Sequence, residues 1–93
     1  MFTGDIHGRV VVVTTDSLLI DVYSIIVEGK KVNLGNRALV QFPKSFMSTL
    51  PLINDPVNIR GLIETKDPQL VTIRTGFNSN EFIRFNGKVF FIQ

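Results

Sequence analysis

Asp5 and His7 are the residues whose types and spacing come closest to metal chemistry. A carboxylate and an imidazole two positions apart can both serve as metal ligands. A catalytic two-metal site needs several further ligands from other parts of a chain. His7 is the only histidine among the 93 residues, and the sequence contains no cysteine. We therefore expect no metal, no cofactor and no enzymatic activity.

The segment around these two residues, Gly4–Arg9, resembles the first motif of the calcineurin-type metallophosphatases. The resemblance implies that Asp5 and His7 bind one metal of a two-metal site. It also implies a second Asp, an Asn-His pair and further histidines from later loops. Gly35-Asn36-Arg37 has Arg where that family has His. We therefore interpret Gly4–Arg9 as a polar N-terminal arm that enters the first strand.

Other catalytic patterns are missing from the sequence. A Ser–His–acid triad would have to use the single histidine, and there is no G-x-S-x-G element. The chain also lacks a G-x-x-x-x-G-K-[ST] phosphate loop and a G-x-G-x-x-G fingerprint. These absences favour a binding function over catalysis.

Composition points in the same direction. Hydrophobic residues make up 44% of the chain, which is generous for 93 residues and too high for disorder. The net charge is only +2, from ten Lys/Arg against eight Asp/Glu. No window reaches the roughly 18 to 20 apolar residues of a membrane span, and no signal peptide opens the chain. We expect a location in the cytoplasm or within a virus particle, and no membrane partner.

Short β-branched or aromatic runs, separated by turn residues, dominate the chain. We predict a single domain over residues 1–93, all-β, a small antiparallel barrel or sandwich of about seven strands. One short helix is predicted over 44–50, with Phe46, Met47 and Leu50 on one face, between Pro43 and Pro51. The predicted strands cover 8–15, 18–27, 32–34, 37–42, 57–64, 70–75, 82–85 and 88–92.

Asn86-Gly87 lies between two apolar runs, which is the strongest short-range signal for a β-hairpin. A two-residue turn predicts that Phe82 faces Phe91 and that Arg84 faces Val89. Both faces of this hairpin carry large apolar groups, which a sheet with one wet face does not need. One face should pack on the core, and the other should be covered by the helix, another sheet or another subunit. We predict that Phe82, Val89 and Phe91 form the interface if a subunit covers it.

The segment Val32–Ile59 resembles the swapped-hairpin DNA-binding proteins of the AbrB/MazE type. In that family a Gly-Asn or Gly-Arg turn opens a strand ending in Pro, and a short helix and an acidic turn follow. The resemblance implies DNA contacts from Arg37 and Lys44. It departs from the family at Gln41, where a basic residue is usual. The matching positions are Gly35, Asn36, Pro43, Lys44, Met47, Leu50, Leu52, Asp55, Val57 and Ile59.

A second nucleic-acid surface is predicted on the sheet itself. Arg60, Arg74 and Arg84 alternate with the inward Val/Ile set, and Phe82 shares a face with Arg84. A basic stripe that carries an aromatic ring can bind a single strand through phosphate contacts and stacking. Arginines on a solvated face also serve simply to keep sheet edges apart, and we favour that interpretation.

From the sequence we expect a non-enzymatic protein-interaction or assembly module. It would be a homo-oligomer or a small structural component of a larger assembly, such as a phage or virus particle. Its partners would be copies of itself or assembly neighbours. The alternative is a DNA-binding regulator of the AbrB/MazE type that uses residues 32–59.

The absence of a ligand set leads to a first prediction, that folding needs no metal. Dialysis against EDTA should leave the melting temperature unchanged, because packing alone holds the strands together. A fall of several degrees, accompanied by the loss of a stoichiometric metal in elemental analysis, would contradict this expectation.

Overall fold

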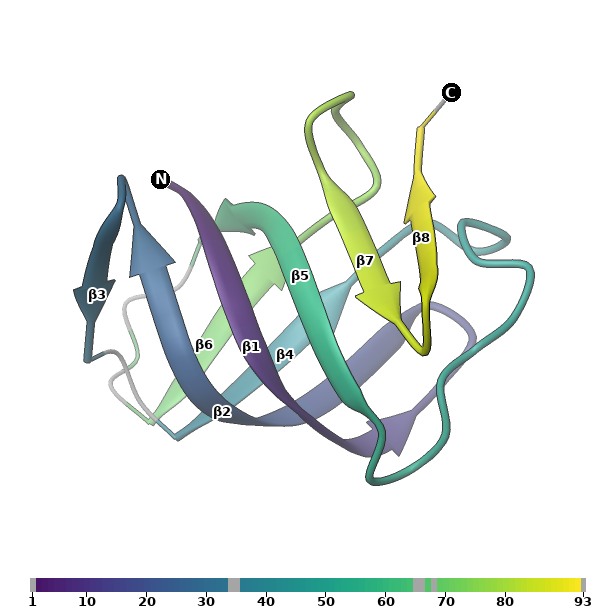
Figure 1. Cartoon of the computed structure of the whole chain (residues 1–93), viewed down its shortest axis with the longest axis horizontal. Helices are drawn as coiled ribbons and strands as arrows, with labels where there is room; N and C mark the ends of the chain where they lie inside the picture. The colour runs from purple at the N-terminus through teal and green to yellow at the C-terminus, as the bar shows by residue number, and fades with distance from the viewer. Residues whose placement is uncertain (1, 34–35, 65–66, 68, 93) are drawn as a thin grey trace.

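A computed structural model describes residues 2–33, 36–64, 67 and 69–92. The described residues form eight strands of one sheet, as Figure 1 shows. The predicted all-β class is therefore confirmed. The strands are β1 (Phe2–Val13), β2 (Ser17–Val27), β3 (Lys30–Val32), β4 (Arg37–Gln41), β5 (Pro56–Ile63), β6 (Leu70–Arg74), β7 (Phe82–Phe85) and β8 (Lys88–Phe91).

Five of these strands close into a barrel in the order β1-β2-β4-β6-β5, and β1 also pairs with β5. The sheet is thus a barrel, one of the two predicted architectures. The prediction of purely antiparallel pairing was wrong for one pair, because β4 and β6 run parallel. Two chain segments far apart in sequence meet there, and no local pattern reports their relative direction. The strands outside the barrel are β3, β7 and β8.

The first strand begins earlier than predicted. Gly4–Arg9 is not a polar arm but part of β1, whose burial alternates along the strand. Ile6 is buried, whereas the neighbouring Asp5 and His7 are only partly covered. One polar face of a strand was mistaken for a loop.

The helix predicted at 44–50 is absent, because these residues form turns and bends. A segment of about two turns has too little intrinsic stability to be helical unless packing favours it. Here Ser45 has a φ of 69°, which lies outside the right-handed helical region. The apolar side chains still reach the core, where Met47 is buried and Phe46 and Leu50 pack against it.

Inward-facing apolar side chains from the strands fill the core of the barrel. Inward Val57, Ile59 and Ile63 of β5 and Val71 and Ile73 of β6 are all buried, as the alternating pattern predicts. The remaining buried apolar residues are Ile6, Val10, Leu18, Ile20, Ile25, Ala38, Val40, Phe42, Met47, Ile83 and Phe85.

One edge of β5 serves two partners. Its last residues pair with β6, whereas Asn58–Arg60 pair with β7. Thr75 sits where β6 ends, fully buried, and its hydroxyl donates a 2.7 Å hydrogen bond to the Arg60 carbonyl. This bond ties the end of the barrel to the start of the β7–β8 hairpin.

We predict that Thr75→Val destabilises the fold by about 1–2 kcal/mol, because it removes the donor and leaves a buried carbonyl poorly satisfied. Urea unfolding measures this cost. Thr72→Val is the matched control on β6, since Thr72 is only partly buried. It should change stability by less than about 0.5 kcal/mol. Equal stability of the two variants would contradict the role given to Thr75.

Candidate functional site

Four neighbouring strands, β7, β5, β1 and β2, share an outward face on which arginine and aromatic side chains gather. The register places Arg60 between Asp5 of β1 and Phe82 of β7. Because side chains alternate along a strand, residues two positions away extend the same face. We call this surface the arginine–aromatic face, and its members are Arg9, Tyr23, Arg60, Phe82 and Arg84.

Arg60 is the best-anchored member of the face. Its Nε donates to Asp5 Oδ1 at 2.7 Å and its Nη2 to Asp5 Oδ2 at 3.3 Å. This two-pronged contact with a carboxylate raises the pKa of Arg60 above its ordinary value. The Arg60 guanidinium also lies 5.1 Å from the centroid of the Phe82 ring, and the Arg84 guanidinium lies 5.4 Å from the same centroid.

A second aromatic ring lies on the neighbouring part of the face. The guanidinium of Arg9 is 5.8 Å from the centroid of Tyr23, and the His7 ring meets Tyr23 edge-on at 5.4 Å. His7 Nδ1 donates a hydrogen bond to Asn58 Oδ1 at 2.9 Å. Asp5 and His7, the two metal-ligand candidates, thus both contact protein groups.

A shallow hollow of about 260 Å³ opens on this face. The hollow is lined by the hydrogen-bonded pairs Asp5–Arg60 and His7–Asn58 and by the aromatic ring of Phe82. Within the part of the chain that the structure describes, no group of three or more His, Asp or Glu side chains is placed to hold a metal ion. The other lining residues are Ile6, Ser24, Ile26, Ile59 and Arg84.

The hairpin of β7 and β8 has the predicted register. Phe82 pairs with Phe91 and Arg84 with Val89, and both turn residues, Asn86 and Gly87, have positive φ. The inward side chains of β7 are buried in the core. On the outward side, Val89 and Phe91 remain 45% and 50% exposed, and Phe82 is half-buried. The three predicted interface residues thus share a surface that the rest of the chain leaves open.

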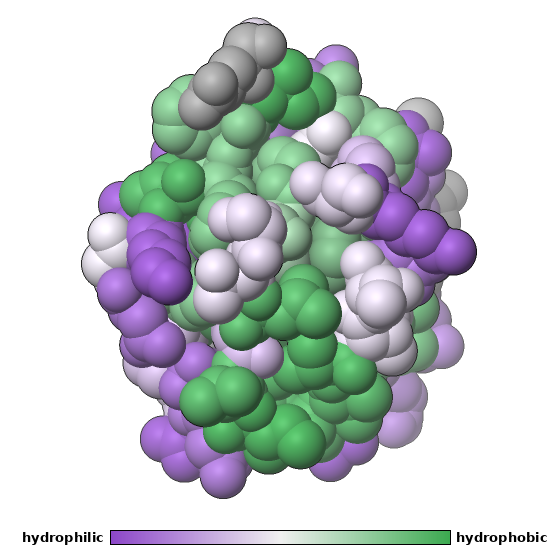
Figure 2. Space-filling model, turned by 90° about the vertical axis from the view of Figure 1, so that its right-hand side faces the viewer, coloured by the Kyte–Doolittle hydropathy of each residue, from purple (hydrophilic) through white to green (hydrophobic). Residues whose placement is uncertain are grey.

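Exposed apolar residues continue beyond the hairpin. Asn86 Nδ2 donates to Asp55 Oδ2 at 3.1 Å, which ties the hairpin turn to the segment that carries Leu52 and Ile53. Leu52 is 72% exposed and Ile53 62% exposed. Figure 2 views the side on which β8 and residues 42–55 lie, and hydrophobic residues gather below its centre.

The predicted nucleic-acid residues do not all come together. Arg37 opens β4 and is paired with Asp21 at 3.1 Å, whereas Lys44 follows the far end of that strand. Arg74 Nε lies 3.5 Å from Glu64 Oε1, and Arg74 faces Leu62, two residues along β5 from Arg60. Arg60 and Arg84 become neighbours through Phe82, whose ring both guanidinium groups approach. Gly35, part of the AbrB/MazE resemblance, lies outside the described residues.

Two members of the arginine–aromatic face, Arg9 and Tyr23, were missed in the sequence analysis. Arg9 occupies the outward position two residues after His7, so alternation along an earlier start of β1 could have indicated it. Tyr23 follows Val22 at an irregularity in the β1–β2 pairing, where Gly8 faces Val22 after His7 faces Ser24. Such a register shift depends on the partner strand and leaves no local signal.

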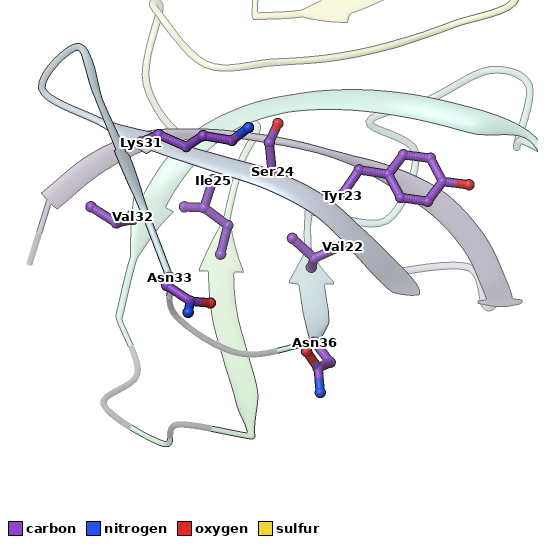
Figure 3. A pocket seen from close by; sticks show the side chains of 8 residues that line it. All are labelled: Val22, Tyr23, Ser24, Ile25, Lys31, Val32, Asn33 and Asn36. Atoms are coloured by element: carbon purple, nitrogen blue, oxygen red, sulfur yellow. The ribbon is translucent and has the colours of Figure 1, made fainter.

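A larger hollow of about 450 Å³ lies beside β2 and β3. In Figure 3, Tyr23 and Ser24 project on one side of β2, and Val22 and Ile25 project on the other. The lining residues that the structure describes are Val22, Tyr23, Ser24, Ile25, Lys31, Val32, Asn33 and Asn36.

No family model, curated protein or solved structure matches this chain. The strand order, with one parallel pair, defines a closed five-stranded barrel with three further strands. That architecture hosts unrelated functions, so it assigns none here. No helix among the described residues is long and apolar enough to cross a membrane.

Proposed function

We propose that the protein is a non-enzymatic assembly module whose copies associate through the open edge of β8. The observation that carries the proposal is an unpaired strand edge whose exposed side chains are apolar. β8 pairs with β7 alone among the described strands. Such an edge is a template for another strand unless the chain protects it.

The backbone groups on this edge alternate in a defined way. Phe85 and Lys88 flank the two-residue turn and form the first hydrogen-bonded pair of the hairpin. Phe90 then also bonds inward, toward Ile83, so the N–H and C=O groups of Val89 and Phe91 point away from β7. The same two residues carry the exposed apolar side chains.

The open edge of β3, unlike that of β8, is protected against pairing with another strand. β3 pairs with β2 alone among the described strands, so it also has an open edge. Lys30 and Lys31 are exposed along β3. Lysine is a common means of preventing edge pairing. β8 carries a single lysine, Lys88, next to the turn, and its remaining exposed residues are apolar.

A second copy of the chain fits this edge. Two β8 strands related by a two-fold axis would pair antiparallel, with Val89 opposite Phe91 of the second copy and Phe91 opposite its Val89. That register uses all of the outward backbone groups and sets apolar side chains opposite each other. Lys88 would face Ile92, so no like charges meet. A dimer of this kind could serve as a building block of a larger assembly, such as a virus particle.

The DNA-binding alternative based on residues 32–59 has less support than assembly through β8. Its helix is not formed, and Arg37 already has a carboxylate partner in Asp21. Lys44 lies at the other end of β4, so the two residues offer no shared surface to a duplex.

We predict that the wild-type protein dimerises and that Phe91→Lys raises the dimer dissociation constant at least tenfold. The substitution removes apolar burial twice in a symmetric dimer, and about 1.4 kcal/mol already corresponds to tenfold. Sedimentation equilibrium measures the constant. Phe2→Lys is the matched control, because Phe2 is 57% exposed and belongs to β1, whose start lies away from β8 in Figure 1.

A second variant separates backbone pairing from side-chain burial. Val89→Pro removes an N–H that has no partner among the described residues, so the monomer should keep its melting temperature while the dimer is lost. A monomeric wild type at millimolar concentration would overturn the proposal. Equal weakening by Phe2→Lys and Phe91→Lys would also overturn it.

A further inference from the structure

We propose that the arginine–aromatic face binds single-stranded nucleic acid. The inference does not rest on assembly through β8, because its charged and stacking groups lie on β1, β2, β5 and β7. The one residue shared with the predicted interface is Phe82, which pairs with Phe91. It takes up the sheet-face alternative raised by Arg60, Arg84 and Phe82, with Arg9 and Tyr23 added to it.

The charges on this face are unevenly balanced. Arg37, Arg60 and Arg74 each have a carboxylate partner within 4 Å. Among the described residues, no ion pair involves Arg9 or Arg84, and both lie on this face. Asp5 pairs with Arg60, and Asp21, which lies opposite Arg9 in the β1–β2 register, pairs with Arg37. The guanidinium groups of Arg9 and Arg84 therefore remain free to meet phosphate.

Each free arginine lies beside an aromatic ring. Arg84 lies over Phe82, and Arg9 lies over Tyr23, which is 52% exposed. Bases of a single strand stack on aromatic rings and on the planes of arginine side chains. Phosphate-binding and base-stacking groups thus occur in pairs at two places on one sheet surface.

The spacing of the two pairs suits a polymer better than a small molecule. Arg84 and Arg9 are two strands apart and two residues out of register, which corresponds to roughly 12 Å between their Cα atoms. The hollow that Arg84 lines, about 260 Å³, is smaller than the roughly 300–1,000 Å³ of sites that enclose a drug-sized ligand. A chain lying across the strands can contact both pairs at once.

A single strand fits this surface better than a duplex. Reading a duplex requires a helix or a β-ribbon that enters the major groove. The arginine–aromatic face lies on the side of a barrel, and Phe82 is half-buried within it. Unstacked bases can reach such a surface, whereas bases inside a duplex cannot.

Fluorescence anisotropy with a fluorescein-labelled 15-nucleotide dT probe tests the proposal, with a 15-base-pair duplex for comparison. Wild type should bind the dT probe at about 50 mM salt and lose affinity as salt rises. Arg9→Ala and Arg84→Ala should each weaken binding about fivefold or more and lower the salt slope by about 0.7. Tyr23→Ala should weaken binding by at least about fivefold with the salt slope unchanged, because it removes stacking and no charge.

Lys30→Ala is the matched control, since it removes one exposed positive charge from β3, off this face. It should leave the dissociation constant within about twofold, and all variants should keep the wild-type melting temperature. No binding of the dT probe at 50 mM salt would overturn the proposal. An effect of Lys30→Ala equal to that of Arg84→Ala, or tighter binding of the duplex than of dT, would overturn it as well.

Discussion

The fold depends on β1 and β5 closing a barrel of only five strands. β1 pairs with β2 along one edge and with β5 along the other, so the sheet has to coil tightly around a small core. At Gly8 a Cβ would lie 2.2 Å from the Asp21 carbonyl oxygen, and at Gly61 it would lie 2.2 Å from the Arg74 carbonyl oxygen. Real Cβ atoms do not approach backbone so closely, and only glycine permits these contacts.

Both candidate surfaces follow from this closure. Because β6 occupies only the last residues of the β5 edge, β7 takes the rest, and the β7–β8 hairpin extends outside the barrel with one edge of β8 open. The same arrangement lines up Phe82, Arg60 and Asp5 on the outward face. If two copies pair through β8, their sheets become continuous, and the arginine–aromatic faces of both copies belong to one extended surface.

The sequence predicted local features well and non-local ones poorly. The hairpin register was predictable because Asn86-Gly87 requires a two-residue turn. The buried face of β5 was predictable because apolar and polar residues alternate along most of this strand. The parallel pairing of β4 with β6 could not be predicted, since it joins segments more than thirty residues apart. The prediction of a helix at 44–50 was wrong because three apolar residues between two prolines indicate burial but do not determine backbone conformation. In the candidate site, Arg84 and Phe82 were found within one strand. Arg9 required an earlier start of β1, and Tyr23 required knowledge of the pairing of β1 with β2.

The free energy of unfolding of Gly61→Ala, measured by urea denaturation, tests the closure most directly. The added Cβ would meet the backbone of Arg74, which cannot rotate away as a side chain does. We expect a loss of about 3 kcal/mol or more. Gly29→Ala provides the comparison, because Gly29 has a φ of 77° and nothing within 4 Å of its Cβ position. That variant should lose only about 1–2 kcal/mol, from backbone conformation alone. A loss at Gly61 no larger than the loss at Gly29 would contradict the account of a barrel closed by close backbone contact.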